Sequence, residues 1–368
     1  MKKPKFYSLR KIVTYDSIYN MIIGERSNGK TFAVLERILK NYLNNGSQGA
    51  VIRRWSDDFK RHRGQQMFEG IVSAGLLINT GWDGIDYKAG EWTLYKFDDE
   101  LDKKVYDRQP FCYAFALSTM EHDKSTSYSN VRTILFDEFL TRSNYLVDEF
   151  TLFMNTISTI IRYRDDVKIY MCANTVNKSA PYFAEMGLKH VSMMKPGTID
   201  LYRYGDSGLT VAVEYCGSSE HVRESKPSDK YFAFENPKLQ MITGGAWEMN
   251  VYPHCPMRYR PKDVRKTFFI IWEEDILQCE IVYVNKVDFM FIHRKTTPIQ
   301  DEDKDLIFSV TSDPRRNWRR NILKPYDKIG QTIASYFNQD RVYYQNNEIG
   351  EIVRNYLMYC SKCSIIKT

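Results

Sequence analysis

The chain has 368 residues, of which 43% are hydrophobic, and a net charge of 52 − 46 = +6. It is long enough for about two domains with buried cores, and its 26 tyrosines and 20 phenylalanines exclude a disordered chain. No apolar run approaches the roughly 18 residues that a membrane helix needs. Seven mostly isolated cysteines indicate a reducing compartment, and the Cys360–Cys363 pair has no second ligand pair for zinc. The small basic excess fits a nucleic-acid partner without requiring one.

A candidate phosphate-binding loop lies in residues 22–32, IIGERSNGKTF. The apolar stretch 20–24 predicts a strand, and the apolar spacing within 31–43 predicts a helix. Glycines between a strand and a helix let backbone N–H groups turn towards phosphate oxygens. Lys30 is expected to reach the β- and γ-phosphates and the Thr31 hydroxyl to bind Mg²⁺; the alternative is a strand–helix turn with Lys30 in solvent. The predicted nucleotide-binding residues of this loop are Gly24, Asn28, Gly29, Lys30 and Thr31.

A second candidate segment is RTILFDEFL, residues 132–140, in which an apolar strand ends in two consecutive acids. Asp137 suits the Mg²⁺ shell, and Glu138 suits a catalytic base that orients and deprotonates a water. The alternative is a pair of solvated acids at a strand end. The second carboxylate is typical of hydrolytic motors rather than of kinases or GTPases.

Other apolar stretches predict an α/β fold with a doubly wound parallel sheet. Residues 49–55 predict a strand that ends at Arg53 and Arg54, and residues 111–118 predict a strand in a central position. Residues 168–175 predict a strand that ends at Asn174, whose amide either senses the γ-phosphate or the attacking water, or forms a simple turn. The site is expected at the carboxyl ends of these strands.

An amphipathic helix is predicted over residues 147–166, with Arg162 and Arg164 at its end. These arginines either complement the helix dipole or supply an arginine finger to a neighbouring subunit. The sequence alone favours the first role, in which the arginines complement the helix dipole.

Together, SIYNMIIGERSNGKTF, GAVIRRW, HDKSTSYSNVRTILFDEFL, IIRYRDDVKIYMCANTV and APYF resemble the DNA-packaging (encapsidation) ATPases of small podophages. These are ring-forming motors of the additional-strand P-loop class, and the resemblance is strong over about residues 5 to 185. It implies ATP and Mg²⁺ as cofactors, and a pentameric ring at the portal of a prohead. It further implies double-stranded DNA as cargo, a packaging RNA that docks the ring, and no membrane. The expected location is the host cytoplasm, with transient attachment to the prohead.

The resemblance also implies roles for single residues. Arg162 matches the finger that acts in trans, which reverses the preference for the dipole. Lys124 matches a lysine at the subunit interface, and Arg53 an arginine near the nucleotide. Ser56 departs from the pattern, because the family can carry a basic residue there.

The resemblance and the changes in composition predict three parts: a P-loop ATPase domain over 1–216, a linker or lid over 217–256, and a C-terminal domain over 257–368. Residues 190–217 predict further strands. Residues 267–295 predict a β-meander that turns near 273–275 and near 285–286. Two helices are predicted around 328–338 and 348–358.

The family's C-terminal domain resembles a degenerate RNase H-type nuclease. An active nuclease of this type needs two or more clustered carboxylates to hold metal ions. In this chain, the first predicted strand of the C-terminal domain, TFFIIW, contains no acidic residue. Glu280 and Asp288 are available, but the simpler interpretation is that they are exposed acids on a strand face. No nuclease activity is therefore predicted.

Nucleic-acid contacts are predicted from basic clusters. DPRRNWRRNILK, residues 313–324, can meet several phosphates and stack a base on its tryptophan; the alternative is a solvated basic face. Residues 301–305, DEDKD, predict a solvated acidic loop. Residues 56–66 contain four basic residues that contact DNA or belong to a solvated helix. The candidate C-terminal residues are Arg315, Arg316, Trp318, Arg319 and Arg320.

The leading hypothesis is an ATPase that translocates double-stranded viral DNA into a preformed capsid. One alternative is a large-terminase-like enzyme that also cuts DNA, and another is a nucleic-acid-binding scaffold with an inert P-loop. A small-molecule kinase is disfavoured by the consecutive acids and by the size of the C-terminal part.

Overall fold

The structure, a computed structural model, describes residues 6–60, 62–122, 127–141, 145–176, 180–216, 251–272 and 274–362. The chain divides into two compact units, residues 1–248 and 249–368. The predicted linker over 217–256 lies outside the described residues up to position 250. Its last residues belong to the second unit, where the Tyr344 N–H donates to the Pro253 carbonyl at 2.9 Å.

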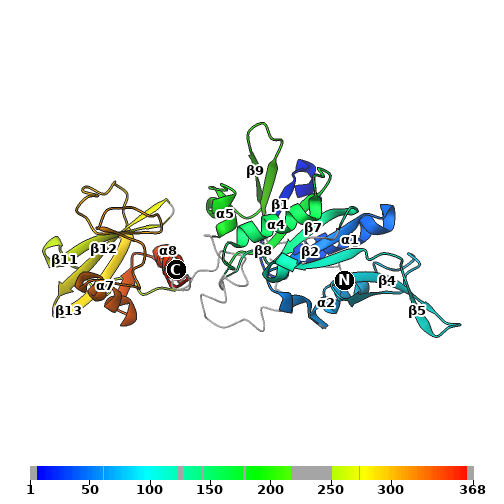
Figure 1. The fold of residues 1–368 in the computed structure, drawn as a ribbon. Coiled ribbons are helices and arrows are strands. Elements are labelled where there is room, and N and C mark those ends of the chain that lie inside the picture. The colour runs from blue at the N-terminus through cyan, green and yellow to red at the C-terminus, as the bar shows by residue number, and fades with distance from the viewer. Residues whose placement is uncertain are drawn as a thin grey trace. The chain divides into compact units, whose positions relative to one another are not determined.

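The first unit contains a ten-stranded sheet in the order β3-β4-β6-β2-β7-β8-β1-β10-β9, with β5 paired to β4. Figure 1 labels β1, β2, β7 and β8 of this sheet together with α1 and α4. Six neighbouring strands run parallel to one another, namely β6, β2, β7, β8, β1 and β10. All six residues of β1 are buried, as expected for a parallel strand covered on both faces. The parallel strands are β1 (Tyr19–Gly24), β2 (Gln48–Arg53), β6 (Cys112–Ala116), β7 (Val131–Asp137), β8 (Lys168–Asn174) and β10 (Thr210–Tyr215).

Antiparallel strands extend both edges of this sheet, and the sequence did not predict those at one edge. They are β3 (Gly84–Lys88), β4 (Glu91–Asp98) and β5 (Lys103–Tyr106), with β9 (Thr198–Arg203) at the other edge. The central position predicted for 111–118 is wrong, because β6 borders the antiparallel β4 and β7 lies at the centre. The strand predicted from residue 190 is also wrong at its start, where a short 3₁₀ turn, Val191–Met193, replaces it.

Helices cover both faces of the sheet, which confirms the predicted α/β layering. On one face, α1 (Lys30–Asn45) and α3 (Glu69–Ser73) contribute Leu39 and Ile71 to an apolar core. On the other, α4 (Glu149–Ile161) and α5 (Pro181–Glu185) contribute Phe153 and Tyr182 to a second core. Other short helices in the described part of this unit are α2 (His62–Gln66), η1 (Ile12–Tyr15), η2 (Ser56–Phe59) and η3 (Leu117–His122).

Helix α4 is shorter at both ends than the helix predicted over 147–166. It ends at Ile161 because Arg162 and Tyr163 both adopt left-handed backbone conformations, with φ of 43° and 68°. Both candidate arginines therefore follow the helix. Residues 56–66 form not one helix but η2 and α2.

The second unit is a six-stranded sheet in the order β15-β14-β11-β12-β13-β16. The predicted meander is confirmed, with its second turn at Asn285 and Lys286, both at positive φ. Helices α7 (Lys328–Asn338) and α8 (Asn347–Lys362), also predicted, pack on one face of the sheet. The remaining elements are β11 (Val264–Trp272), β12 (Asp275–Val284), β13 (Val287–Arg294), β14 (Ile307–Ser309), β15 (Trp318–Arg319), β16 (Val342–Tyr344) and η7 (Pro261–Asp263). None of the helices in the described ranges has the length and apolar character needed to cross a membrane.

Candidate active site

The glycine loop joins the end of β1 to the start of α1. Gly29 precedes the helix with φ of +92°, and a Cβ there would lie 3.0 Å from the Cβ of Phe6. Glycine is favoured at this position because other residues rarely adopt this conformation. The N-terminal segment lies against the loop, because the Tyr7 N–H donates to the Asn28 carbonyl at 2.8 Å.

The Lys30 side chain is folded over the loop and is only 5% exposed. Its Nζ donates to the Glu25 carbonyl at 2.5 Å and to the side-chain oxygens of Asn28 at 3.2 Å and Asn174 at 3.4 Å. Burial lowers the pKa of Lys30, while nearby acidic groups act in the opposite direction. This geometry excludes the alternative of Lys30 in solvent. It also brings Asn174, from the end of β8, to the loop.

Thr31 and Asp137 meet at the carboxyl edge of the sheet. The Thr31 hydroxyl donates to Asp137 Oδ1 at 2.6 Å, and Asp137 is only 4% exposed. The hydroxyl and the carboxylate are oxygen donors of the kind that Mg²⁺ prefers. Within the described ranges, no group of three or more His, Cys, Asp or Glu side chains is placed to hold a metal. Two protein oxygens fit Mg²⁺ bound together with phosphates and waters, and do not fit a metal enclosed by protein alone.

Arg53 lies between the two acids of the second motif. Its Nη2 donates to Asp137 Oδ2 at 2.5 Å, and its Nη1 lies 3.6 Å from Glu138 Oε2. Burial acts to lower the pKa of Arg53, but Asp137 and Glu138 outweigh it and raise the pKa. The Glu138 side chain is 63% exposed, so its carboxylate is accessible to water.

Sequence reasoning missed the roles of Arg54 and Glu149, which form a buried ion pair. The Arg54 guanidinium donates to both Glu149 oxygens, at 2.7 and 2.8 Å, and both residues are buried. A signal was present, because successive residues of a strand point to opposite faces. If Arg53 faces the nucleotide, Arg54 points into the opposite core and needs a carboxylate there.

The structure distinguishes the two arginines after α4. The Arg164 guanidinium donates to five backbone carbonyls at 2.6–3.1 Å, which ties it to the start of β7 and the end of α4. Arg162 and Tyr163 are exposed, whereas the Arg164 side chain is 20% exposed and occupied by these carbonyls. The other predicted interface residue, Lys124, lies outside the described residues.

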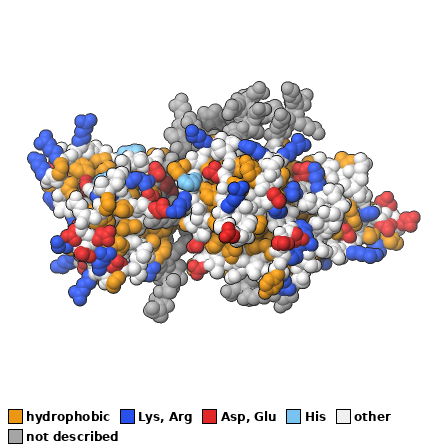
Figure 2. All heavy atoms as spheres, turned by 90° about the horizontal axis from the view of Figure 1, so that it is seen from above, with side chains coloured by type: hydrophobic (Ala, Val, Ile, Leu, Met, Phe, Trp, Pro, Cys, Tyr) orange, Lys and Arg blue, Asp and Glu red, His pale blue; other side chains and the backbone are white. Residues whose placement is uncertain are grey.

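The predicted nucleic-acid cluster of the second unit is partly neutralised. Arg315 pairs with Asp313 at 2.9 Å and with Asp303 at 3.0 Å, and it covers the Trp318 ring at 4.6 Å. Arg319 pairs with Asp327 at 2.6 Å. The acidic loop 301–305 is therefore not merely solvated, as predicted, but contacts the cluster. Arg316 and Arg320 are exposed, and Figure 2 shows basic side chains along the rim of this unit with acidic ones among them.

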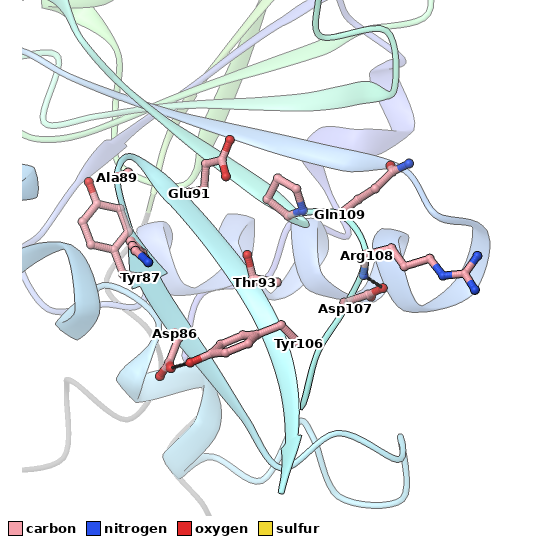
Figure 3. A pocket seen from close by; sticks show the side chains of 11 residues that line it. Asp86, Tyr87, Ala89, Glu91, Thr93, Tyr106, Asp107, Arg108 and Gln109 are labelled. Atoms are coloured by element: carbon pink, nitrogen blue, oxygen red, sulfur yellow. Dashed lines mark hydrogen bonds between the residues drawn. The ribbon is translucent and has the colours of Figure 1, made fainter. Parts of the chain in front are cut away.

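An open pocket of about 610 Å³ lies on the antiparallel edge of the first sheet (Figure 3). The Tyr106 hydroxyl and the Lys104 ammonium both donate to Asp86, at 2.7 and 2.8 Å. No predicted site residue lines this pocket. The candidate active site is therefore not this pocket but the glycine loop, where predicted site residues contact one another.

The two acids considered for a nuclease site lie on opposite faces of the second sheet. Glu280 is paired with Phe291, and Asp288 with Tyr283. Positions 280 and 283 point to opposite faces because their spacing is odd. Asp288 accepts from Tyr336 at 2.8 Å. The two acids cannot converge on one metal ion.

Glu280 instead belongs to a polar group with Tyr259, Gln278 and His293. His293 Nε2 lies 3.6 Å from Glu280 Oε1, and the Tyr259 hydroxyl donates to the other oxygen at 2.5 Å. The contact with His293, followed by the hydrogen bonds from Tyr259 and Gln278, lowers the pKa of Glu280 to about 2. Glu280 in turn raises the pKa of His293.

We predict that Glu280→Gln destabilises this unit most near pH 5–6, by about 1 kcal/mol. The carboxylate contribution is present above the unfolded pKa of about 4.5 and is lost as the pH falls towards about 2. The imidazolium contribution is present below about 6.5 and is lost as the pH rises through the raised pKa of His293. Hydrogen exchange of the β12 amides measures the effect. An equal effect at pH 6 and pH 9, or an unchanged pH dependence in a His293→Gln background, would contradict it.

Comparison with known proteins supports the predicted resemblance. The model of the podovirus DNA encapsidation protein (Gp16) family matches residues 1–227. The DNA packaging proteins of Bacillus phages phi29 and PZA are each 28% identical to the chain over 188 residues, which is 50% of this chain and 50% of each relative. The chain thus aligns with about half the length of these curated relatives.

Solved structures support the fold over nearly the whole chain. A chain of the bacteriophage Phi-29 viral genome packaging motor assembly has a TM-score of 0.56 and 21% identity, over 97% of this chain and 98% of that one. A chain of the Phi-28 gp11 DNA packaging motor has a TM-score of 0.52 and 17% identity, over 99% and 98%. These identities show a shared fold. The family model matches well over half of the residues of this chain, and the chain therefore belongs to the podovirus DNA encapsidation protein (Gp16) family.

Proposed function

We propose that the protein is an ATPase that drives double-stranded viral DNA into a preformed capsid. One observation carries the proposal: Lys30, Thr31, Arg53, Asp137 and Asn174 come together at the carboxyl edge of four adjacent strands, beside Glu138. The chain belongs to a DNA encapsidation family, which supports DNA as the molecule that is moved. An inert scaffold would not need these polar groups to converge.

In this mechanism the side chains bind the triphosphate and activate a water. The Lys30 ammonium exchanges its loop carbonyls for phosphate oxygens, and the Asn174 amide beside it orients the γ-phosphate or the water. Glu138 accepts the proton of the attacking water. Arg53 holds the Asp137 carboxylate in place and steadies Glu138 electrostatically.

Thr31 and Asp137 would hold Mg²⁺, which supplies positive charge against the phosphate oxygens. The direct hydrogen bond between these two residues supports this assignment, because it already brings two suitable oxygens together. Arg162 completes the site of a neighbouring subunit by stabilising charge on the transferred phosphoryl group.

The finer architecture is proposed on the same basis. Strand β8 lies between the loop strand β1 and the acidic strand β7, as expected for the additional-strand class. The meander β11–β13 continued by the parallel β14 and β15 fits an RNase H-type ancestry of the C-terminal unit. We propose that the chain is divided into an ATPase domain over 1–216, a linker or lid over 217–256 and a C-terminal domain over 257–368. We also propose a pentameric ring that contacts a packaging RNA and the portal, in the host cytoplasm.

A large-terminase-like enzyme that also cleaves DNA is the second candidate. It is disfavoured by the opposite orientations of Glu280 and Asp288 and by the absence of an acid from β11. Incubation of supercoiled DNA with the protein and Mn²⁺ distinguishes the two candidates. Linear or nicked products would favour the terminase-like enzyme.

DNA stimulation of ATP hydrolysis tests the proposed function. We predict that double-stranded DNA raises the rate at least about tenfold, and that the rate per subunit rises with protein concentration as neighbouring subunits complete each site. Phosphate release is measured across protein concentrations, with and without DNA and proheads. A rate that ignores both DNA and concentration would contradict the proposal and favour a self-contained NTPase.

A further inference from the structure

Glu138 occupies an unusual backbone conformation for a non-glycine residue, and a neighbouring side chain holds it there. Its φ is +57°, in the left-handed region. The carbonyl of Glu138 accepts from Arg54 Nη1 at 3.2 Å, and the next carbonyl, of Phe139, accepts from Arg54 Nη2 at 2.9 Å. Such conformations persist only where the surroundings impose them, and they concentrate at functional sites. Arg54 is the side chain that bonds both carbonyls of this turn.

The Arg54 guanidinium is itself fixed from the other side. Its Nε and Nη2 donate to the two carboxylate oxygens of Glu149, and both side chains are buried, at 7% and 0% exposure. Glu149 also accepts from the Tyr182 hydroxyl at 2.7 Å and from the Leu146 N–H at 2.7 Å. A buried pair with all its partners in place is rigid, because any movement would leave a charge without compensation.

The pair therefore connects three elements to the turn that carries the candidate base. Arg54 follows β2, Glu149 is the first residue of α4, and Tyr182 belongs to α5. We propose that Arg54, fixed by Glu149, is a positioning residue that sets the backbone of Glu138 so that its carboxylate faces the water to be activated. This inference rests on the proposed ATPase activity. It assigns Arg54 no contact with nucleotide.

Arg54→Lys is the direct test, because lysine keeps the charge but cannot make four hydrogen bonds from one planar fork. We expect kcat for ATP hydrolysis to fall at least about tenfold, while the Kd for a fluorescent ATP analogue changes less than about twofold. Arg132→Lys is the matched control. It alters an arginine on β7 that pairs with Asp166 at a more exposed site, and it should leave kcat unchanged.

A double-mutant cycle with Glu138→Gln separates positioning from general damage. If Arg54 acts through Glu138, Arg54→Lys should lower the residual rate of Glu138→Gln less than about twofold. An equal fold-loss in both backgrounds, or a kcat of Arg54→Lys within twofold of wild type, would overturn the inference.

Tyr182→Phe is the second variant. It tests the inference if Arg54→Lys does not fold, which the absence of a cooperative unfolding transition would reveal. It removes one hydrogen bond to Glu149 and leaves the contacts of Arg54 intact. We expect kcat to fall about threefold with unchanged nucleotide binding, and an unchanged kcat would overturn the inference. Failure of the proposed function is distinguishable, because then wild type itself would not hydrolyse ATP in the presence of DNA and proheads.

Discussion

Replacing Glu138 by glutamine should lower the rate of ATP hydrolysis by about 10²–10⁴-fold, the range for loss of a general base. Glutamine has nearly the same shape but cannot accept a proton from water. The fold should be unaffected, because the side chain is largely exposed and its contact with Arg53 is 3.6 Å long. Nucleotide affinity should also be retained, since the loop and Lys30 remain intact.

Steady-state phosphate release and fluorescent-nucleotide binding measure these two effects separately. Glu100→Gln is the matched control, because it makes the same chemical change at an exposed turn between β4 and β5. It should leave both quantities unchanged. Near-normal hydrolysis by Glu138→Gln would show that another group activates the water.

Replacing Arg162 by alanine should lower kcat by about 10³-fold or more, as expected for loss of an arginine finger. The residue is exposed after α4, so its replacement should lower the free energy of unfolding less than replacement of the part-buried Arg164. Arg164→Ala should behave differently. It removes the donor to five carbonyls and should destabilise the first unit by about 1–3 kcal/mol.

Mixing two inactive variants tests whether Arg162 acts in trans. In a mixed ring, an Arg162→Ala subunit keeps its Glu138 and receives the arginine of a Glu138→Gln neighbour. The mixture should therefore hydrolyse ATP faster than either variant alone, with a maximum near equal amounts. A mixture no faster than its components would argue that Arg162 serves its own subunit.

The sequence predicted the parts of the fold that depend on local patterns. The strand–loop–helix around Lys30 and the acidic strand ending at Asp137 follow from apolar spacing and glycine positions. The β-meander and both C-terminal helices were predicted for the same reason. The left-handed end of α4 was not, because Arg162 and Tyr163 carry no glycine or proline signal.

Contacts between distant segments could not be predicted from spacing. Glu149 lies 95 residues from Arg54, and nothing local marks the two as partners. The edge strands β3 to β5 were missed because their pairing depends on neighbours that are defined only in the folded sheet. The pairing of Arg315 with Asp303 was also missed, because residues 301–305 were predicted to be solvated, although they lie close to Arg315 in sequence.

Protection of DNA from nuclease inside proheads tests whether this protein drives DNA into a capsid. Purified proheads with their RNA are incubated with the protein, genomic DNA and ATP, and then treated with DNase. We predict full-length protected DNA with wild type and ATP, and none with Glu138→Gln or without ATP. Active ATP hydrolysis by wild type without any protected DNA would contradict the proposal that this ATPase drives DNA into a capsid.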